Sequence, residues 1–330
     1  MNNRGPLSAL RTWWRTLLGV AARPAPELDL NTRLEGDSLV DAAFLRRLDR
    51  LALQTNRRLR GDNIGARPSF RRLPASDFRE HRQYLPGDDL RHVDWNASAR
   101  SQHVFVKLGE RPKEAAIHLL LDSTASMQWG EPSKLWAARR LAAALGYIAL
   151  NHGDRLAVAD TAGQSAPYGP KMGKGQVPAL LRYLRELPFP KQADLAAATL
   201  RLARASRRGG LAVLISDLAE VDDLAPVLTP LRPPTWQVLV LHLLHPAELE
   251  PTLRGEIELH DAETGERANY DLNPEALERY RAFAAEWCAK VEQACLSHGA
   301  AYGRVLADWS IEQAVLPYLR RRRMVDQVQA

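Results

Sequence analysis

The segment IHLLLDSTASM, at residues 117–127, limits the possible folds more than any other stretch of the chain. Four of its first five residues are apolar, and they do not alternate with polar residues as they would in a half-exposed strand. A strand that is apolar on both faces is typical of a parallel sheet covered by helices on each side. The polar residues after it then lie at the carboxyl end of a buried strand, where open α/β sheets bind ligands. The sequence therefore predicts an α/β fold with a site directly after residue 121.

Oxygen-bearing side chains follow this strand at alternate positions, namely Asp122, Thr124 and Ser126. A small hard cation such as Mg²⁺ takes oxygen ligands, few of them charged, and completes its octahedron with water. Residues 210–217 form a second doubly apolar strand, which also ends in a carboxylate, Asp217. Two acids at neighbouring strand ends predict a site at this edge of the sheet. The alternative is that both aspartates only cap helices and accept hydrogen bonds from loop amides.

From residue 113 to residue 323 the chain alternates between strand and helix patterns. Strands are predicted at residues 117–121, 155–161, 210–217, 235–244 and 302–306, with a hairpin at 255–270. Helices are predicted at residues 135–153, 175–187, 194–205, 274–298 and 311–320. This alternation predicts one mostly parallel sheet flanked by helices.

The two ends of the chain are predicted to lie outside this domain, as an N-terminal segment with a linker at residues 1–36 and a tail at residues 324–330. An apolar stripe within residues 8–21 could make peripheral contact with a membrane or pack as a helix on the body of the protein. Its longest apolar run, residues 17–22, is too short to span a bilayer.

Residues 37–112 are predicted to begin with an amphipathic helix, at residues 39–53, and to continue into a β-rich segment at residues 77–110. The β-rich segment combines carboxylates, guanidiniums and an aromatic ring at short range. We interpret these side chains as a partner-binding surface made of Arg79, Asp88, Asp89, Arg91, Asp94, Trp95 and Arg100. The alternative is an ion-pair network that only holds an irregular segment in place.

Charge and cysteine content bear on compartment and ligand class. The net charge of +6 would allow binding to nucleic acid, but arginine is spread over the whole chain, which leaves that role as an alternative only. The two cysteines, Cys288 and Cys295, are seven residues apart in a helical pattern, about 10.5 Å along the axis and too far for a disulfide. This pattern fits a cytoplasmic protein in a reducing compartment.

Several motifs together resemble a known family. DSTAS, at residues 122–126, resembles the D-x-S-x-S metal-ion-dependent adhesion motif of von Willebrand factor A domains, with Thr124 at the first serine position. The further motifs are REHRQYLPGDDLRHVDWNASAR at 79–100, ISDL at 215–218, HPAELEP at 245–251 and YRAFAAEW at 280–287. With them, residues 40–322 resemble domain-of-unknown-function family 58. The resemblance implies a bacterial protein with a von Willebrand factor A-like, Rossmann-like domain, often encoded beside a MoxR-type AAA+ ATPase.

One position departs from the pattern of the resembling families. They place a threonine in the loop before the helix at residues 194–205, and this chain has Ala193 there. Water could replace the lost hydroxyl, at a cost in affinity. The metal set implied by the resemblance is Asp122, Thr124, Ser126 and Asp217, with Asp194 nearby.

We predict a non-catalytic protein-interaction module that acts with a MoxR-type AAA+ ATPase on a client protein. The chain has no G-x-S-x-G elbow, H-E-x-x-H pair or P-loop. The alternative functions are a metal-dependent phosphoesterase and a nucleic-acid-binding protein. For an enzyme, the histidines that could serve as a base or ligands are His92 beside Asp94, and the pair His242 and His245.

Overall fold

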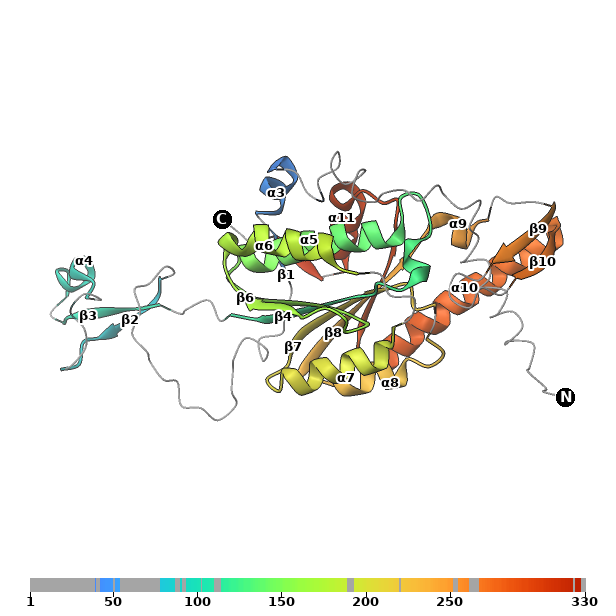
Figure 1. Ribbon diagram of the computed structural model, residues 1–330. Helices are drawn as coiled ribbons and strands as arrows, with labels where there is room; N and C mark the ends of the chain where they lie inside the picture. Colours follow the sequence, from blue (N-terminus) through green and yellow to red (C-terminus); the bar gives the residue numbers. More distant parts are fainter. Residues whose placement is uncertain are drawn as a thin grey trace.

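The computed structural model describes residues 39, 42–49, 51–53, 78–86, 90, 93–101, 103–109, 114–188, 193–219, 221–251, 255–260, 267–322 and 324–327. A six-stranded sheet forms the centre of the molecule (Figure 1). Its strands are β4 (Ala116–Leu121), β5 (Arg155–Asp160), β6 (Tyr168–Lys171), β7 (Gly210–Ser216), β8 (Trp236–Leu244) and β11 (Ala301–Leu306). The strand order is β11-β8-β7-β4-β5-β6, and all neighbours are parallel except β5 and the edge strand β6. The predicted mostly parallel sheet is therefore confirmed.

The strand order places a crevice beside β4. The chain first moves from β4 to β5 and β6 on one side, and it then returns to build β7, β8 and β11 on the other side. Loops that leave the carboxyl ends of β4 and β7 therefore run in opposite directions and open a crevice between them. Asp122 and Asp217 come directly after these two strands, so the sheet topology brings the predicted site residues to one edge.

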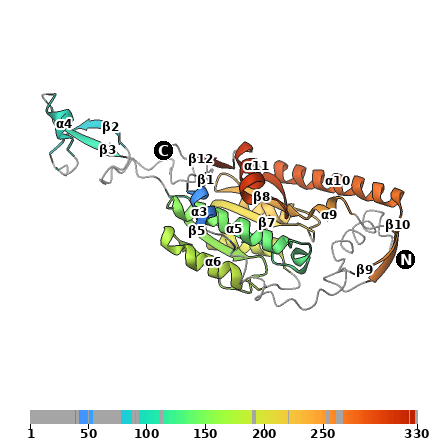
Figure 2. The ribbon, with the colours of Figure 1, turned by 90° about the horizontal axis from the view of Figure 1, so that it is seen from above.

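Helices cover both faces of the sheet (Figures 1 and 2). One face packs against α5 (Lys134–Asn151), α6 (Val177–Glu186) and α11 (Leu316–Arg321). The other face packs against α7 (Leu195–Ala205), α8 (Ala225–Leu228) and α10 (Pro274–Ser297). Shorter helical segments are η3 (Ala125–Gln128), η4 (Lys174–Gln176), η5 (Thr229–Leu231), α9 (Pro246–Leu249) and η6 (Ile311–Val315).

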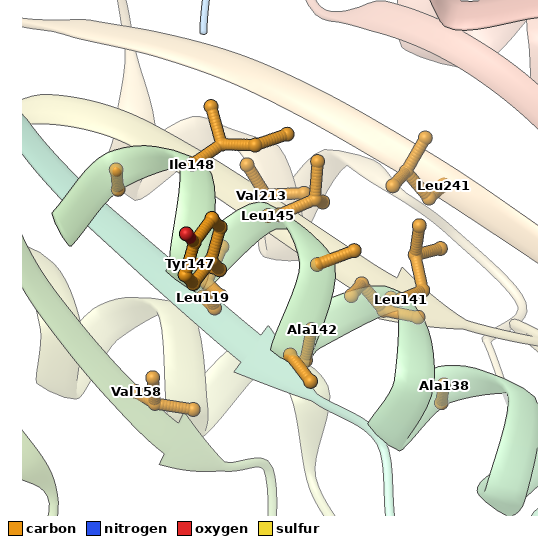
Figure 3. Close-up of a cluster of buried hydrophobic side chains, with 14 of the residues drawn as sticks. Leu119, Ala138, Leu141, Ala142, Leu145, Tyr147, Ile148, Val158, Val213 and Leu241 are labelled. Atoms are coloured by element: carbon orange, nitrogen blue, oxygen red, sulfur yellow. The ribbon is translucent and has the colours of Figure 1, made fainter. Parts of the chain in front are cut away.

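The doubly apolar strands explain this three-layer arrangement. In β4, Leu119 and Leu121 belong to the core on the α5 side, whereas Leu120 belongs to the core on the opposite side. Side chains that alternate across a strand bury both faces only if a helix covers each one. Figure 3 shows how Leu141 and Leu145 of α5 lie over β4 and its neighbours in the sheet. Burying each such leucine contributes about 2 kcal/mol.

The ends of the described chain differ from the sequence-based expectations. The helix predicted for residues 39–53 ends early, as α3 (Ala42–Leu48), and is followed by a short strand, β1 (Leu51–Leu53). The predicted tail from residue 324 contains β12 (Val325–Gln327), which pairs antiparallel with β1. Leu48, Leu53 and Val325 are buried in the core on the α5 side. Their apolar side chains gain more from this core than from an exposed helix or tail, which is why both segments join the α/β domain.

Two antiparallel hairpins complete the fold. In the predicted β-rich segment, β2 (Phe78–Gln83) pairs with β3 (Phe105–Gly109), and the one-turn helix α4 (Trp95–Ser98) packs on β3. Figure 1 shows this unit apart from the six-stranded sheet. The second hairpin joins β9 (Gly255–His260) to β10 (Arg267–Leu272) between α9 and α10.

Some predictions fall outside the described residues, including the N-terminal segment 1–36 with its stripe at 8–21 and the basic run at 57–72. Within the part of the chain that the structure describes, no helix combines the length and apolarity needed to cross a membrane.

Candidate functional site

A pocket of about 400 Å³ opens at the carboxyl edge of the sheet. The ends of β4 and β5 contribute Asp122, Thr124 and Thr161, and the start of α7 contributes Ala193 and Asp194. The segment after β7 adds an apolar wall and two further acids, Asp222 and Asp223. The pocket is the crevice that the strand order predicts, and its polar lining is dominated by carboxylates.

Asp122 lines this pocket and is 7% exposed. Its Oδ1 accepts hydrogen bonds from the backbone N–H of Thr124 at 3.1 Å and from the Thr124 hydroxyl at 2.9 Å. Its Oδ2 accepts a hydrogen bond from the Ser216 hydroxyl of β7. Burial raises the pKa of Asp122, and the nearby Asp217 raises it further. These neutral donors therefore leave the negative charge of Asp122 without full compensation.

Hydroxyl groups connect the two carboxylates. The Thr124 and Ser126 hydroxyl oxygens are 3.0 Å apart, and the Ser126 hydroxyl also hydrogen-bonds to the side chain of Asp217. Both residues are buried, and η3 begins directly after Thr124. The alternate spacing of the motif thus brings three oxygen-bearing side chains to one place, as predicted.

Asp217 has a cation as its direct partner, unlike Asp122. The Lys134 ammonium, at the first turn of α5, donates to Asp217 Oδ2 at 2.6 Å and also to Glu248 of α9. All three side chains are almost completely buried. Burial alone would raise the pKa of Asp217, but the Lys134 ammonium, with hydrogen bonds from the Ala219 N–H and Ser126, outweighs burial and holds that pKa below its ordinary value. The pKa of Glu248 is raised, because burial and Asp217 outweigh the same ammonium.

The charges in this cluster do not balance. The cluster holds three buried carboxyl groups, Asp122, Asp217 and Glu248, and one buried ammonium, that of Lys134, which contacts the last two. Full ionisation would leave two negative charges uncompensated in a medium that solvates charge poorly. Protons on Asp122 and Glu248, or a cation in the adjoining pocket, would restore the balance, which agrees with the raised pKa of both groups.

His242 contacts the backbone of the loop after β7. Its Nε2 lies 3.0 Å from the backbone carbonyl of Asp217, which can only accept, so Nε2 carries the proton. Its Nδ1 then accepts from the Tyr302 hydroxyl at 2.8 Å. Burial lowers the pKa of His242 to about 3, so the ring is neutral near neutral pH. Leu218, which follows Asp217 in this loop, has a φ of 54°. This left-handed conformation is uncommon for leucine and persists only where surrounding contacts impose it.

The other candidate ligands differ in their contacts. Asp194 lines the pocket but is exposed, and its Oδ1 accepts from the Ala197 N–H at 2.9 Å as the N-cap of α7. Asp194 therefore caps a helix in this structure. Ala193 lines the same pocket as Asp122, with a methyl group in place of a hydroxyl.

The sequence reasoning missed Lys134, Glu248 and Thr161. Lys134 carried a usable signal, because a lysine at the start of a helix is repelled by the positive end of the helix dipole and needs an anionic neighbour. Glu248 lay within the HPAELEP motif, but only the fold brings it to Lys134. Thr161, whose hydroxyl is 3.5 Å from Asp122 Oδ1, follows an ordinary strand and had no local signal.

The predicted partner-binding surface is only partly described. Asp88, Asp89 and Arg91 lie outside the described residues, as does the side chain of Arg79. Asp94 is the N-cap of α4, and its Oδ1 accepts from two backbone N–H groups, those of Asn96 and Ala97. Trp95 is 64% exposed, and Arg100 is also exposed.

The histidines nominated as a catalytic base have structural contacts. His92 lies outside the described residues. His245 is the N-cap of α9, where its Nδ1 accepts from the Ala247 N–H, so it does not share the strand with His242. Both ring nitrogens of His242 are already hydrogen-bonded.

The donor set of the site suits a hard cation. No group of three His, Cys, Asp or Glu residues converges as metal ligands within the described residues. The cluster instead offers two carboxylates and two hydroxyls, from Asp122, Asp217, Thr124 and Ser126, which are oxygen donors of the kind that Mg²⁺ accepts with water in the remaining positions.

Comparison with known proteins found a sequence family and several relatives. Residues 80–290 match the family described as "Protein of unknown function DUF58". An uncharacterized protein of Mycobacterium bovis and one of Mycobacterium tuberculosis are each 31% identical to the chain over 252 residues, which is 73% of this chain and 77% of each relative.

Two solved structures are also similar. The conserved hypothetical protein BatB from Bacteroides thetaiotaomicron aligns with a TM-score of 0.38 and 16% identity, over 64% of this chain and 98% of that chain. An aerotolerance-related membrane protein from Bacteroides fragilis aligns with a TM-score of 0.40 and 20% identity, over 63% and 99% of the two chains.

Proposed function

The chain belongs to the family described as protein of unknown function DUF58, and on that premise we propose that it is a non-catalytic protein-interaction module whose partner binds at the pocket above Asp122. The domain is assigned to the von Willebrand factor A-like type on the motif at residues 122–126. What carries the proposal is a buried, incompletely compensated carboxylate that lines an open pocket.

A divalent cation supports this function. Asp122, Thr124, Ser126 and Asp217 would hold Mg²⁺, and the bound cation would supply a coordination position that an Asp or Glu of the partner fills. Without a cation, the acidic lining of the pocket would repel such a side chain. The partner's carboxylate is therefore accepted only by the loaded site.

The contacts of the nominated bases favour binding over catalysis. A general base must be free to reach the proton it removes, yet His242 uses both ring nitrogens within the fold and His245 caps a helix. A phosphodiesterase assay with Mg²⁺ or Mn²⁺ tests the hydrolase alternative. Turnover by the wild type that Asp122→Ala abolishes would contradict the non-catalytic assignment.

The proposed partners are a MoxR-type AAA+ ATPase, as the motif resemblance implies, and a client protein. The proposed compartment is the cytoplasm, which the cysteine pattern fits. Two surfaces are then available for two proteins. The pocket above Asp122 binds an acidic side chain, and the exposed Trp95 on α4 offers an aromatic contact of the kind that dominates many interfaces. Figure 1 shows the β2–β3 hairpin with α4 apart from the six-stranded sheet.

Affinity purification from the native cell tests this function directly. The tagged wild-type protein is compared with and without Mg²⁺, alongside Asp122→Ala and the control Asp308→Ala, which changes an exposed aspartate outside the site. We expect an AAA+ ATPase or a client to be retained only with Mg²⁺, by the wild type and the control. Retention that is equal for Asp122→Ala, or unaffected by chelation of Mg²⁺, would refute the metal-dependent mode.

A further inference from the structure

Two features of position 134 disfavour a lysine. Lys134 is the first residue of α5, where the helix dipole repels positive charge, and its side chain is 0% exposed. A buried ammonium is tolerated only when anions and hydrogen-bond acceptors compensate the lost hydration. Asp217 and Glu248 provide that compensation, and they raise the pKa of Lys134 although burial alone would lower it.

The same contact occupies one of the carboxylates of the candidate cation site. Asp217 Oδ2 accepts from the Lys134 ammonium at 2.6 Å, while Oδ1 accepts from the Ala219 N–H at 3.1 Å. The Ser126 hydroxyl bonds to this carboxylate as well. A divalent cation that approaches Asp122 and Asp217 therefore meets a carboxylate whose charge is already neutralised by a fixed cation beside it.

We propose that Lys134 is an internal counter-ion that competes with a divalent cation for Asp217 and so keeps the cation affinity of the site low. This inference rests on the proposed function. Two positive charges near one carboxylate repel each other, and the low polarity of the interior strengthens that repulsion. The site then holds its cation firmly only when a partner's carboxylate adds another ligand, which makes cation and partner binding mutually dependent.

Glu248 sets the strength of this competition. It accepts a second hydrogen bond from Lys134 and also accepts from the His245 N–H at 2.7 Å, which fixes it within α9. Its negative charge also attracts the ammonium, so Asp217 shares Lys134 with a second carboxylate. Neutralising Glu248 alone should therefore leave Lys134 bound more strongly to Asp217. Removing both the Lys134 ammonium and the Glu248 charge should free Asp217 for a metal.

Mn²⁺ binding, measured by the loss of free-ion electron paramagnetic resonance signal, tests this ordering in the full chain. The double variant Lys134→Met, Glu248→Gln removes the ammonium without leaving its second carboxylate unpaired. The single variant Glu248→Gln keeps the ammonium and preserves the shape and acceptor atom of the side chain. The variant Lys290→Met, which removes an exposed ion pair outside the pocket, is the control.

We expect the double variant to bind Mn²⁺ at least tenfold more tightly than the wild type, and Glu248→Gln to bind several-fold more weakly. A double variant that is folded, by circular dichroism, and binds no more tightly than the wild type would overturn the role of Lys134 while leaving the cation site intact. If the double variant does not fold, an unchanged Mn²⁺ affinity in Glu248→Gln overturns it instead. Absence of Mn²⁺ binding in every variant would overturn both this inference and the metal-dependent mode of the proposed function.

Discussion

The loops after β4 and β7 both begin with a buried aspartate, but the two carboxylates have different hydrogen-bond partners. In each, a doubly buried strand ends near an aspartate that is at most 7% exposed. The Asp122 carboxylate is held by hydroxyls and a backbone amide, and its pKa is raised. The Asp217 carboxylate is held by an ammonium, and its pKa is lowered. The same local pattern thus produces one carboxylate held by neutral donors and one paired with an ammonium.

The two loops therefore have different roles. Lys134 makes the Asp217 loop part of the framework, because it joins the start of α5, the end of β7 and α9 at one buried point. Asp122 faces the pocket and remains available to a ligand. Substitutions should therefore affect stability most around Asp217 and binding most around Asp122, and the four that follow are ordered by their expected effect on the free energy of unfolding.

Lys134→Met should have the largest effect. It leaves Asp217 and Glu248 buried without their shared ammonium, and breaking a buried ion pair in this way costs about 3–5 kcal/mol. Urea unfolding at neutral pH measures the loss. Lys290→Met removes an exposed ion pair with Glu286 and should stay within about 0.5 kcal/mol of the wild type. Equal effects of the two variants would show that Lys134 is not part of the framework.

Asp217→Asn should cost about 2–3 kcal/mol, because Lys134 loses a charged acceptor but keeps Glu248. The loss should depend on pH. A folded pKa below the ordinary 3.8 contributes stability above that pH, and this contribution disappears as the pH falls through the folded pKa. The difference between wild type and variant should therefore be full at neutral pH and shrink below about pH 4. A difference that does not vary with pH would contradict the charge assignment.

Asp122→Asn should change stability by no more than about 1 kcal/mol, because an amide keeps an acceptor for Thr124. Here the pH dependence has the opposite sign. A raised folded pKa means that ionising Asp122 opposes folding, so the variant should gain stability relative to the wild type as the pH rises above 3.8. Urea unfolding between pH 3 and 8 measures both profiles. Outright unfolding of this variant would favour the capping role over the binding role.

Ala193→Thr should leave the unfolding free energy nearly unchanged and act on the cation alone. A hydroxyl at this pocket position would replace a coordinating water, whose immobilisation costs about 0–2 kcal/mol. That corresponds to at most about a thirtyfold gain in Mg²⁺ affinity. Calorimetric titration of wild type and variant measures the gain, and Ala193→Ser serves as the intermediate case. Equal heats for all three proteins would mean that this side of the pocket does not face the cation.

The sequence determined the architecture and one half of the site. Apolar runs without alternation require helices on both faces, so 117–121 and 210–217 predicted β4 and β7. The structure also brings Asp122, Thr124 and Ser126 together, because a short loop keeps its own residues close to one another. Such features depend on neighbours in the chain, which a sequence displays directly.

Tertiary structure decided the rest. Leu53 fitted a helical stripe, but pairing with β12 and burial in the core made its segment a strand. The ion triad joins residues separated by 83 and 114 positions, so no local pattern could predict that Lys134 would neutralise Asp217. A carboxylate's charge state depends on which groups surround it after folding. Asp122 and Asp217 look alike in the sequence, and the position of one ammonium shifts their pKa values in opposite directions.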